Sequence, residues 1–293
     1  MEIRNLRYFL AVAREENMTR AANLLHVTQP TLSKRLKSLE EEIGKKLFVR
    51  RSFSMQLTEE GILLRDRAAD LVELSDKIIS EFATLDDSYS KDIYLGLAES
   101  YQISYLAAEI RRLKDIYPEL RYHITSGDTE QVVERLDKGL IDFAVLAEKP
   151  DTAKYSCLKF PKEDVWGVIM RSDDPLSEKE KIEVDDLIGR SLFCSDQSWA
   201  NDIPRWAQKK FPLLRQDGSF RLAYNGSIFA KEGLGYLLSF DRLVDVSENS
   251  GLCFRPLSPE LTTPLYLVWR KQPVFSPVSE MLVELLSESF SNA

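Results

Sequence analysis

The stretch from Ala21 to Phe48 reads AANLLHVTQPTLSKRLKSLEEEIGKKLF, and its spacing decides how the N-terminal end of the chain folds. Thr28 is placed to cap a helix, and Pro30 is tolerated in the first turn, where an amide hydrogen has no partner in any case. Gly44 stands at the usual C-terminal position and ends this helix. Its apolar stripe, at steps of four, three and four, consists of Leu32, Leu36, Leu39 and Ile43.

Two helices are predicted before this one. Helical spacing of Leu6, Phe9, Leu10 and Ala13 indicates the first. Thr19 is a candidate N-cap for a short second helix, whose apolar face holds Ala21, Ala22, Leu24 and Leu25. Only a brief turn at His26–Val27 separates the second helix from the third, and this arrangement predicts a helix-turn-helix.

The third helix turns a polar face to solvent near its N-terminus. That face holds Gln29, Thr31, Ser33, Lys34 and Lys37. Gln can pair with adenine, Thr offers a hydroxyl and a methyl, and Lys can reach guanine or phosphate, so the face suits the major groove of DNA. The alternative is the solvated face of an ordinary three-helix domain. The following stretch, KKLFVRRSFSMQLT, predicts a two-stranded wing with Arg50 and Arg51 near its tip.

The charge is divided unevenly along the chain. Residues 1–58 carry 11 Lys/Arg against 6 Asp/Glu, whereas the remainder carries 28 against 41 and the whole chain is at −8. A basic N-terminal module on an acidic body indicates that only one end approaches a polyanion.

The run from Ala21 to Gly61, which ends in LTEEG, closely resembles the N-terminal domain of LysR-type transcriptional regulators. The helix start TQPTLSK, the stretch GKKLF and the final LTxxG stand where that family has them. The resemblance implies base contacts and DNA-backbone contacts. The base contacts would come from Gln29, Pro30, Thr31, Ser33 and Lys34, and the backbone contacts from Arg50 or Arg51. Phe53 stands about where the family usually has a further basic residue.

Thr58 is predicted to cap a long helix that continues to about Leu85. Its apolar stripe consists of Leu64, Ala68, Leu71, Ile78, Phe82 and Leu85. We expect a partner helix to cover this stripe; packing on the chain's own C-terminal domain is the alternative. The family's linker helix pairs with its symmetry mate, which implies a homodimer on a two-fold operator, with a tetramer left open. The polar run to Asp92 then predicts a hinge.

Strands and helices alternate from Ile93 onward, which predicts βαβ units and a mostly parallel sheet. The family resemblance implies that this α/β body is a two-lobed effector domain similar to type 2 periplasmic binding proteins. The predicted organisation is therefore a winged helix-turn-helix at 1–58, a linker helix and hinge at 59–90, and an effector domain at 91–293. Lobe I would comprise about 91–161 and 267–293, and lobe II about 162–266.

Polar side chains at the carboxyl ends of strands, or ahead of helices, are the candidate effector contacts. They are Ser100, Tyr101, Gln102, Thr129, Ser195, Asp196 and Asn225. Ser100 and Thr129 match positions where the family often binds an effector carboxylate, so an anionic metabolite is expected. The alternatives are helix caps for Ser100 and Thr129 and a turn at Asn225–Gly226. Ser239 and Phe240 replace an expected proline and alter the predicted pocket wall.

Other classes of protein fit the sequence less well. Cys157, Cys194 and Cys253 form no disulfide framework or metal spacing, and a cysteine-based redox sensor is kept as an alternative. The chain shows no motif of a known catalytic site, so no enzyme activity, metal or cofactor is expected. A plain solute-binding protein would not need the helix-turn-helix. No apolar run suits a bilayer or signal peptide, which predicts a cytoplasmic regulator without membrane contact, with RNA polymerase as a further candidate partner.

Overall fold

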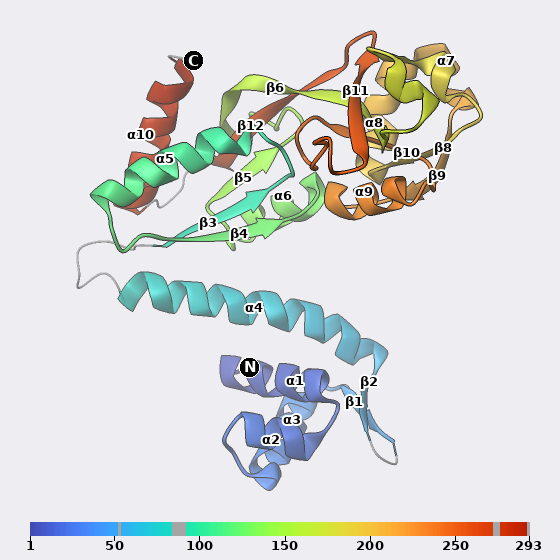
Figure 1. Cartoon of the computed structure of the whole chain (residues 1–293). Helices are drawn as coiled ribbons and strands as arrows, with labels where there is room; N and C mark the ends of the chain where they lie inside the picture. The colour runs from blue at the N-terminus through green and yellow to red at the C-terminus, as the bar shows by residue number, and fades with distance from the viewer. Residues whose placement is uncertain (52–53, 84–91, 272–275, 292–293) are drawn as a thin grey trace. The chain divides into compact units, whose positions relative to one another are not determined.

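The structure, a computed structural model, describes residues 1–51, 54–83, 92–271 and 276–291, apart from the side chains of residues 50, 80, 81 and 83. The chain divides into two compact units, Met1–Ser90 and Lys91–Ala293 (Figure 1). None of the helices in the described ranges combines the length and the apolarity that crossing a membrane requires.

Unit 1 is a winged helix-turn-helix followed by a long helix, as predicted. Its elements are α1 (Ile3–Glu15), α2 (Met18–Leu24), α3 (Gln29–Ile43), β1 (Phe48–Arg50), β2 (Met55–Leu57) and α4 (Glu59–Ala83). The N-cap of α2 is Asn17 and not Thr19, because the Asn17 backbone is still extended and its side chain accepts hydrogen bonds from the amides of Thr19 and Arg20. Gly44 ends α3 in the left-handed conformation, with φ +75°.

The core of unit 1 joins α1, α2 and α3 to the wing. Leu6, Phe9 and Leu32 are fully buried there. The expected stripe of α3 stops at Leu39, and Ile43 is 37% exposed. Leu47 and Phe48 complete the core in its place, because the chain turns back at Gly44.

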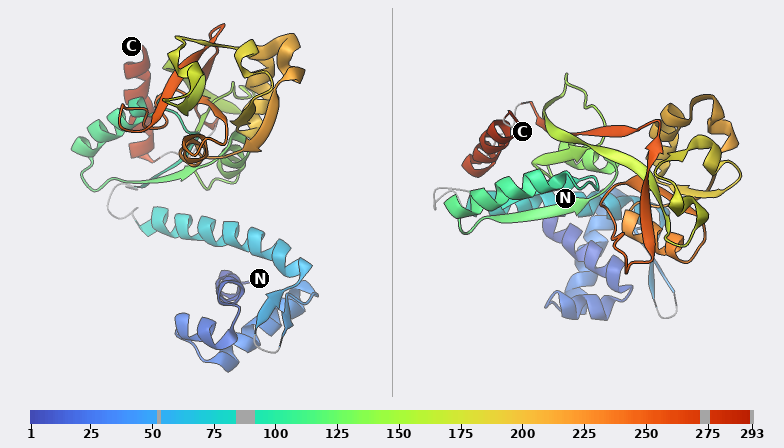
Figure 2. Two further views of the ribbon diagram at one scale, coloured as in Figure 1. Left: turned by 45° about the vertical axis from the view of Figure 1, so that its right-hand side comes forward. Right: turned by 45° about the horizontal axis from the view of Figure 1, so that its top comes forward.

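Helix α4 begins as expected and then shows two different apolar surfaces. The Thr58 hydroxyl accepts a hydrogen bond from the Gly61 amide at 2.9 Å. Figures 1 and 2 show α1 lying along α4, where Arg7 is paired with Asp76. The expectation that α4 has no intramolecular partner was therefore wrong in part, since Leu64, Ala68 and Val72 pack into the unit 1 core. Exposed apolar side chains remain on Leu71, Ile78, Ile79 and Phe82. Leu85 and the predicted hinge lie outside the described residues.

Unit 2 is built on a continuous sheet of ten strands within the described residues, in the order β4-β3-β5-β12-β6-β10-β8-β9, with β11 on β6 and β7 on β11. The strands are β3 (Asp92–Leu97), β4 (Arg121–Ser126), β5 (Phe143–Leu146), β6 (Tyr155–Arg171), β7 (Ile182–Glu183), β8 (Ser191–Cys194), β9 (Arg215–Ser219), β10 (Tyr236–Phe240), β11 (Leu252–Ser258) and β12 (Thr262–Arg270). The α-helices are α5 (Ile103–Ile116), α6 (Thr129–Asp137), α7 (Val184–Leu187), α8 (Asp196–Ala207), α9 (Ala223–Lys231) and α10 (Pro277–Ser291). Short 3₁₀ turns lie at Pro175–Glu178 and Gln208–Leu213.

Two crossing strands join the two lobes of this unit. The first part of β6 pairs antiparallel with β12, from Tyr155 opposite Arg270 to Val165 opposite Thr262. From Trp166 onward β6 pairs instead with β10 and β11. Lobe I therefore contains the β4-β3-β5 edge and lobe II the β10-β8-β9 edge, each with parallel strands beyond the crossing. The predicted parallel sheet is therefore found within each lobe, whereas the strands that join the lobes pair antiparallel.

The central strands of each lobe are covered on both faces, which explains why β5 and β10 are apolar runs instead of alternating patterns. On β5, Phe143 and Val145 face the core shared with α5 and α10, which lie side by side in Figure 2. Ala144 and Leu146 face the opposite core, with Val132 and Leu136 of α6.

A buried carboxyl group lies at the crossing itself. Asp164 of β6, opposite Thr263 of β12, is 2% exposed, and its Oδ2 has no hydrogen-bond partner in the part of the chain that is described. Burial raises the pKa of Asp164 to about 6; hydrogen bonds with Ser100 and Gln102 oppose the increase, and the charge of Asp241 adds to it. Ionising the Asp164 carboxyl group, at the junction between the lobes, therefore costs free energy in the folded protein.

We predict that Asp164 makes unit 2 less stable as the pH rises from about 4 to 7. A folded-state pKa of about 6 against an ordinary value of 3.8 means that the folded form keeps a proton that the unfolded form releases. The stabilisation is complete below the lower pKa and is lost as the pH rises through the upper one, for a total of about 3 kcal/mol. Asp164→Asn should flatten this dependence. Urea unfolding of the full chain, followed by tryptophan fluorescence, measures it, because all four tryptophans lie in unit 2.

The matched control is Glu248→Gln, which removes an exposed carboxyl group from the same unit. Its pH profile should be parallel to that of the unchanged protein. Parallel profiles for Asp164→Asn as well would contradict the assignment of this pH dependence to Asp164.

Candidate functional site

The exposed face of α3 is the first candidate site. Leu32, Leu36 and Leu39 turn into the core, and this orientation leaves the other side of the N-terminal half of the helix to solvent. Of the predicted contacts, Gln29, Pro30, Thr31 and Lys34 are exposed and Ser33 is half-buried. The hydroxyls of Thr28 and Thr31 hydrogen-bond to each other at 2.8 Å. The structure therefore brings these five residues together on one solvent-facing turn and a half of helix.

The cations around this face differ in whether they are already paired. Arg35 pairs with Glu2 and Lys37 with Glu41. Within the described residues, the ammonium group of Lys34 has no ion-pair partner, and it lies in the N-terminal half of α3. The exposed Arg51 is on the wing, where its amide donates to the Ser54 carbonyl at 2.8 Å. The Arg50 side chain and Phe53 lie outside the described residues. Lys34 and Arg51 are therefore available to a polyanion.

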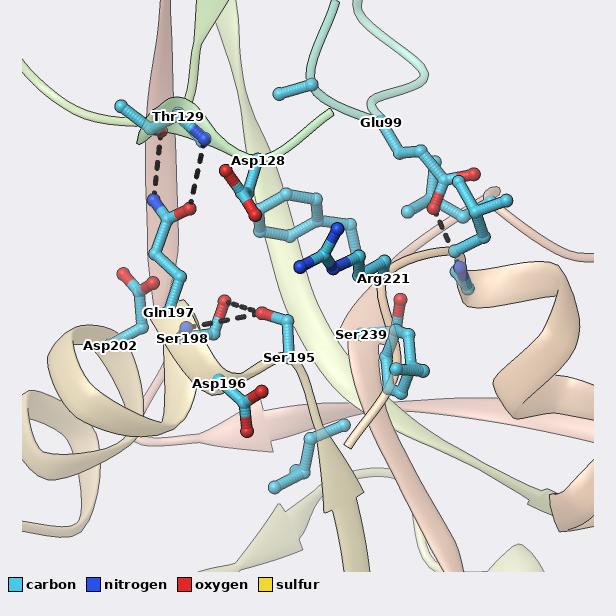
Figure 3. Close-up of a pocket in the computed structure, with 18 of the residues that line it drawn as sticks. Glu99, Asp128, Thr129, Ser195, Asp196, Gln197, Ser198, Asp202, Arg221 and Ser239 are labelled. Atoms are coloured by element: carbon cyan, nitrogen blue, oxygen red, sulfur yellow. Dashed lines mark hydrogen bonds between the residues drawn. The ribbon is translucent and has the colours of Figure 1, made fainter. Parts of the chain in front are cut away.

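The second candidate site is a cavity of about 440 Å³ in unit 2. Lobe I contributes the loops after β3, β4 and β5, and lobe II contributes the N-terminal ends of α8 and α9 together with β10. Figure 3 shows polar side chains from these elements pointing toward a common space. This is the position at strand ends where ligands of open α/β sheets bind.

Three of the seven predicted effector residues line this cavity. They are Thr129, Ser195 and Asp196. Ser100, Tyr101 and Gln102 lie at the crossing instead: Ser100 and Gln102 bond Asp164, and the Arg242 guanidinium lies over the Tyr101 ring at 5.0 Å. Asn225 is exposed inside α9 and not in a turn ahead of a helix. Its neighbour Gly226 packs against the sheet, where a Cβ would lie 2.9 Å from Leu237, so this glycine serves close packing of helix on strand.

Each of three helices presents its N-terminus to the cavity with a side chain of this protein already bound. The carboxylate of Asp128 accepts from the Gln131 amide at 3.0 Å and caps α6. Ser195 caps α8 through the Ser198 amide. Glu99 of lobe I accepts from the Ala223 amide at 2.7 Å and so occupies the N-terminus of α9 in lobe II (Figure 3). The backbone donors that would favour an anionic ligand are partly satisfied within the chain.

Thr129 is also engaged across the cavity. Its hydroxyl accepts from Gln197 Nε2 at 3.0 Å, and its amide donates to Gln197 Oε1 at 3.4 Å, as the paired dashed lines in Figure 3 show. The side-chain amide of Gln197 therefore takes the two contacts that a ligand carboxylate at Thr129 would use. Together with Glu99–Ala223, this pair holds lobe I to lobe II.

The charge of the lining is strongly negative. Six acidic residues line the cavity, Glu99, Asp128, Glu130, Glu148, Asp196 and Asp202, against one arginine among the lining residues, Arg221. Burial raises the pKa of Asp202, and the charge of Glu148 on the other lobe raises it further, while Arg205 and hydrogen bonds to Thr263 and Ser198 oppose this. The expectation of an anionic effector does not suit this lining, because like charges would repel it.

Sequence reasoning missed most of these carboxyl groups. Glu148 comes two residues after the end of β5, so the strand-end rule that selected Ser100 would have found it on the neighbouring strand of the lobe. Glu99 was overlooked beside Ser100. Gln197 and Asp202 were missed because they lie within α8, and the strand-end rule selected only Ser195 and Asp196, which directly follow β8.

The cysteines are placed far from any reactive arrangement. Cys194 of β8 is fully buried, and burial raises the pKa of its thiol far above the ordinary value. Burial also raises the pKa of Cys253 on β11. Cys157, on the lobe I part of β6, is partly buried, and all three thiols are free. The raised pKa values of Cys194 and Cys253 lower their thiolate content, which makes these two thiols poor nucleophiles.

Comparisons with known proteins identify a family for each of the two units. Residues 3–62 match the family described as "Bacterial regulatory helix-turn-helix protein, lysR family", and residues 87–291 match "LysR substrate binding domain". The chain is 29% identical over 195 residues to the hydrogen peroxide-inducible genes activator of Pectobacterium carotovorum subsp. carotovorum, covering 66% of this chain and 64%, less than two thirds, of that relative. It is 28% identical over 281 residues to the HTH-type transcriptional regulator BenM of Acinetobacter baylyi, covering 92% and 90%.

The fold is also that of solved structures. CbnR, a LysR family transcriptional regulator, matches with a TM-score of 0.79 at 20% identity over 99% of both chains. This likeness concerns the fold alone. The two matched segments together cover most of the sequence and coincide with the helix-turn-helix and with the two-lobed unit. The chain therefore belongs to the lysR family of bacterial helix-turn-helix regulatory proteins, with that family's helix-turn-helix domain at residues 3–62 and its substrate-binding domain at residues 87–291.

Proposed function

We propose that this protein is a sequence-specific DNA-binding transcriptional regulator, whose affinity for its operator responds to a small molecule bound in the cavity of unit 2. The observation that carries the first half is the exposed polar turn of α3, with Gln29, Thr31 and the unpaired Lys34 presented by a fully packed core. Gln and Thr suit base edges and Lys suits phosphate or guanine. A solved structure of CbnR with its target DNA supports the same use of this fold.

Replacing Lys34 tests the docking of α3. We expect Lys34→Gln to weaken operator binding about ten-fold, because a desolvated charged contact is lost, and to lower the slope of log K against log salt by about 1. Electrophoretic mobility shift across a salt series measures both. Lys149→Gln, an exposed cation in unit 2, is the control with the same loss of charge. An unchanged slope for Lys34→Gln would argue that α3 does not approach DNA through this residue.

We propose that a second copy of the chain covers the exposed apolar face of α4. Leu71, Ile78 and Phe82 recur at helical spacing and are 39%, 45% and 67% exposed. A patch of this kind on a 25-residue helix favours pairing with an identical helix. Two paired winged domains would read two half-sites of a symmetric operator. Whether two dimers assemble further is an outcome of the same measurement.

Phe82→Glu should therefore dissociate the protein. A charge placed in the apolar contact between two paired helices is costly to bury, so we expect monomers at micromolar concentration and at least a ten-fold loss of affinity for a two-half-site operator. Analytical ultracentrifugation and mobility shift give the two readouts. Glu73→Gln, on the same helix, serves as the control. A dimer that survives Phe82→Glu would place the interface elsewhere.

In the proposed mechanism the effector acts through the two lobes. Glu99–Ala223 and Thr129–Gln197 link lobe I to lobe II across the cavity. A ligand that replaces or adds to these contacts changes the relative stability of two lobe arrangements. A difference in affinity between the arrangements is sufficient for control of DNA binding.

A redox-sensing role is the competing proposal, since several relatives carry the name hydrogen peroxide-inducible genes activator. The burial of Cys194 and the raised pKa of Cys253 disfavour it, because the thiolate is the form that peroxide attacks.

We predict that hydrogen peroxide leaves operator affinity unchanged within two-fold. Mobility shift before and after treatment, with thiol counting by mass spectrometry, measures this. The Cys157→Ala and Cys253→Ala double variant should behave as the unchanged protein does. A peroxide-dependent shift in affinity that this variant abolishes would favour the redox proposal over the small-molecule one.

A further inference from the structure

The cavity has little capacity left for an anion. Two of the three helix N-termini that face it hold carboxylates of the protein, Asp128 on α6 and Glu99 on α9. The third, on α8, is capped by the Ser195 hydroxyl. Backbone donors that are already bonded cannot bind a ligand carboxylate without breaking these contacts. The attraction of these helix N-termini for a ligand anion is therefore partly used by the protein's own side chains.

The other acidic side chains that line the cavity have few ion-pair partners among the described residues. Glu148 and Asp196 have no ion-pair partner in the described part of the chain, and Asp202 has only Arg205 at 3.2 Å. Glu148 of lobe I and Asp202 of lobe II both line the cavity, and the charge of Glu148 adds to the burial that raises the pKa of Asp202. One guanidinium, that of Arg221, does not balance six carboxyl groups. A cation between Glu148 and Asp202 would relieve this repulsion and join the two lobes.

An independent observation points to a ligand in the same space. Ser239 of β10 is 4% exposed and lines the cavity, and its hydroxyl has no hydrogen bond within the described residues. Figure 3 shows its oxygen directed into the cavity. Buried hydroxyls in native proteins almost always have partners, so this hydroxyl, which is directed into the cavity, is placed to bond a molecule bound there. Serine donates or accepts and is compatible with an ammonium group.

We propose that the cavity binds an organic cation that carries ammonium or guanidinium groups, held between Glu148 and Asp202 with Ser239 as a further contact. The inference rests on the proposed role of the cavity as the effector site and names the chemical class of that effector. A cavity of about 440 Å³ accommodates a molecule the size of a short diamine or a guanidinoalkylamine.

Three four-carbon probes of the same length and different charge test the proposal. They are 1,4-diaminobutane, 1,4-butanediol and succinate, with agmatine and spermidine as larger cations. Isothermal titration calorimetry and thermal unfolding of the full chain give affinity and stabilisation. We expect at least one of the cations to bind saturably and to raise the melting temperature, and the diol and succinate to have no effect.

Variants of the full chain locate the binding. Glu148→Gln and Asp202→Asn should each raise the Kd of the bound cation roughly ten-fold or more, since each removes a charged contact. Ser239→Ala should raise it several-fold. Glu148 is exposed, so its near-isosteric replacement keeps the fold even if Asp202→Asn weakens it. Glu180→Gln, an exposed carboxyl group outside the cavity, should leave the Kd unchanged.

The outcomes separate this inference from the proposed function. Cation binding that is lost in Glu148→Gln but not in Glu180→Gln supports it. If succinate changes operator binding and no cation does, the cation proposal is overturned and effector control stands. If no probe of any charge binds while operator binding is intact, the cation proposal is overturned and small-molecule control loses its support. Cation binding that is equal in all the variants is adventitious and overturns the assignment to this cavity.

Discussion

The continuity of strand β6 is the constraint on which unit 2 depends. Its first part shares hydrogen bonds with β12 in lobe I, and the same strand then pairs with β10 and β11 in lobe II. Two lobes that share an extended strand cannot separate without breaking ladder hydrogen bonds, and the partners of this strand change between Val165 and Trp166. Next to that point lies Asp164, whose buried carboxyl group is bonded by Ser100 and Gln102 of lobe I. The two lobes are thus joined at the crossing both by the covalent chain of β6 and by hydrogen bonds to Asp164.

The cavity follows from this arrangement. Parallel strands in each lobe end toward the other lobe, so the loops and helix N-termini that follow them converge from both sides. In this chain the convergent donors are largely satisfied by its own side chains, with Glu99 reaching from one lobe to a helix of the other. The result is a site that is closed by internal polar contacts and lined with excess negative charge. Fold and ligand preference are therefore separable: the fold makes the site, and the side chains decide which charge it accepts.

Helix α4 of unit 1 has one buried and one exposed apolar face. Ala68 and its neighbours on α4 contribute to the core of the winged domain, whereas Phe82 and Ile79 remain exposed. A helix that packs on one face and leaves another uncovered is rigidly joined to the DNA-binding domain and can still meet a partner. Movement of one such helix would carry the recognition helix with it, which gives a physical route from effector to operator.

The sequence by itself determined the helices and strands whose formation depends on interactions between residues close together in the chain. The spacing of Leu32, Leu36 and Leu39, the Gly44 terminus and the Thr58 cap predicted α3 and the start of α4, because helix periodicity and capping act within a few residues. The alternation of strands and helices in unit 2 followed for the same reason, and family resemblance supplied the two-lobed arrangement.

Tertiary structure alone decided which residues from distant parts of the sequence lie next to one another. It moved Ser100 and Gln102 to the crossing, placed Asn225 within a helix, and brought Glu148 opposite Asp202. It also split the α4 stripe by packing α1 against it. Pairing across the lobes depends on β6 and β12, whose register no local pattern reveals, and for that reason the charge of the cavity could be read only after the chain was folded.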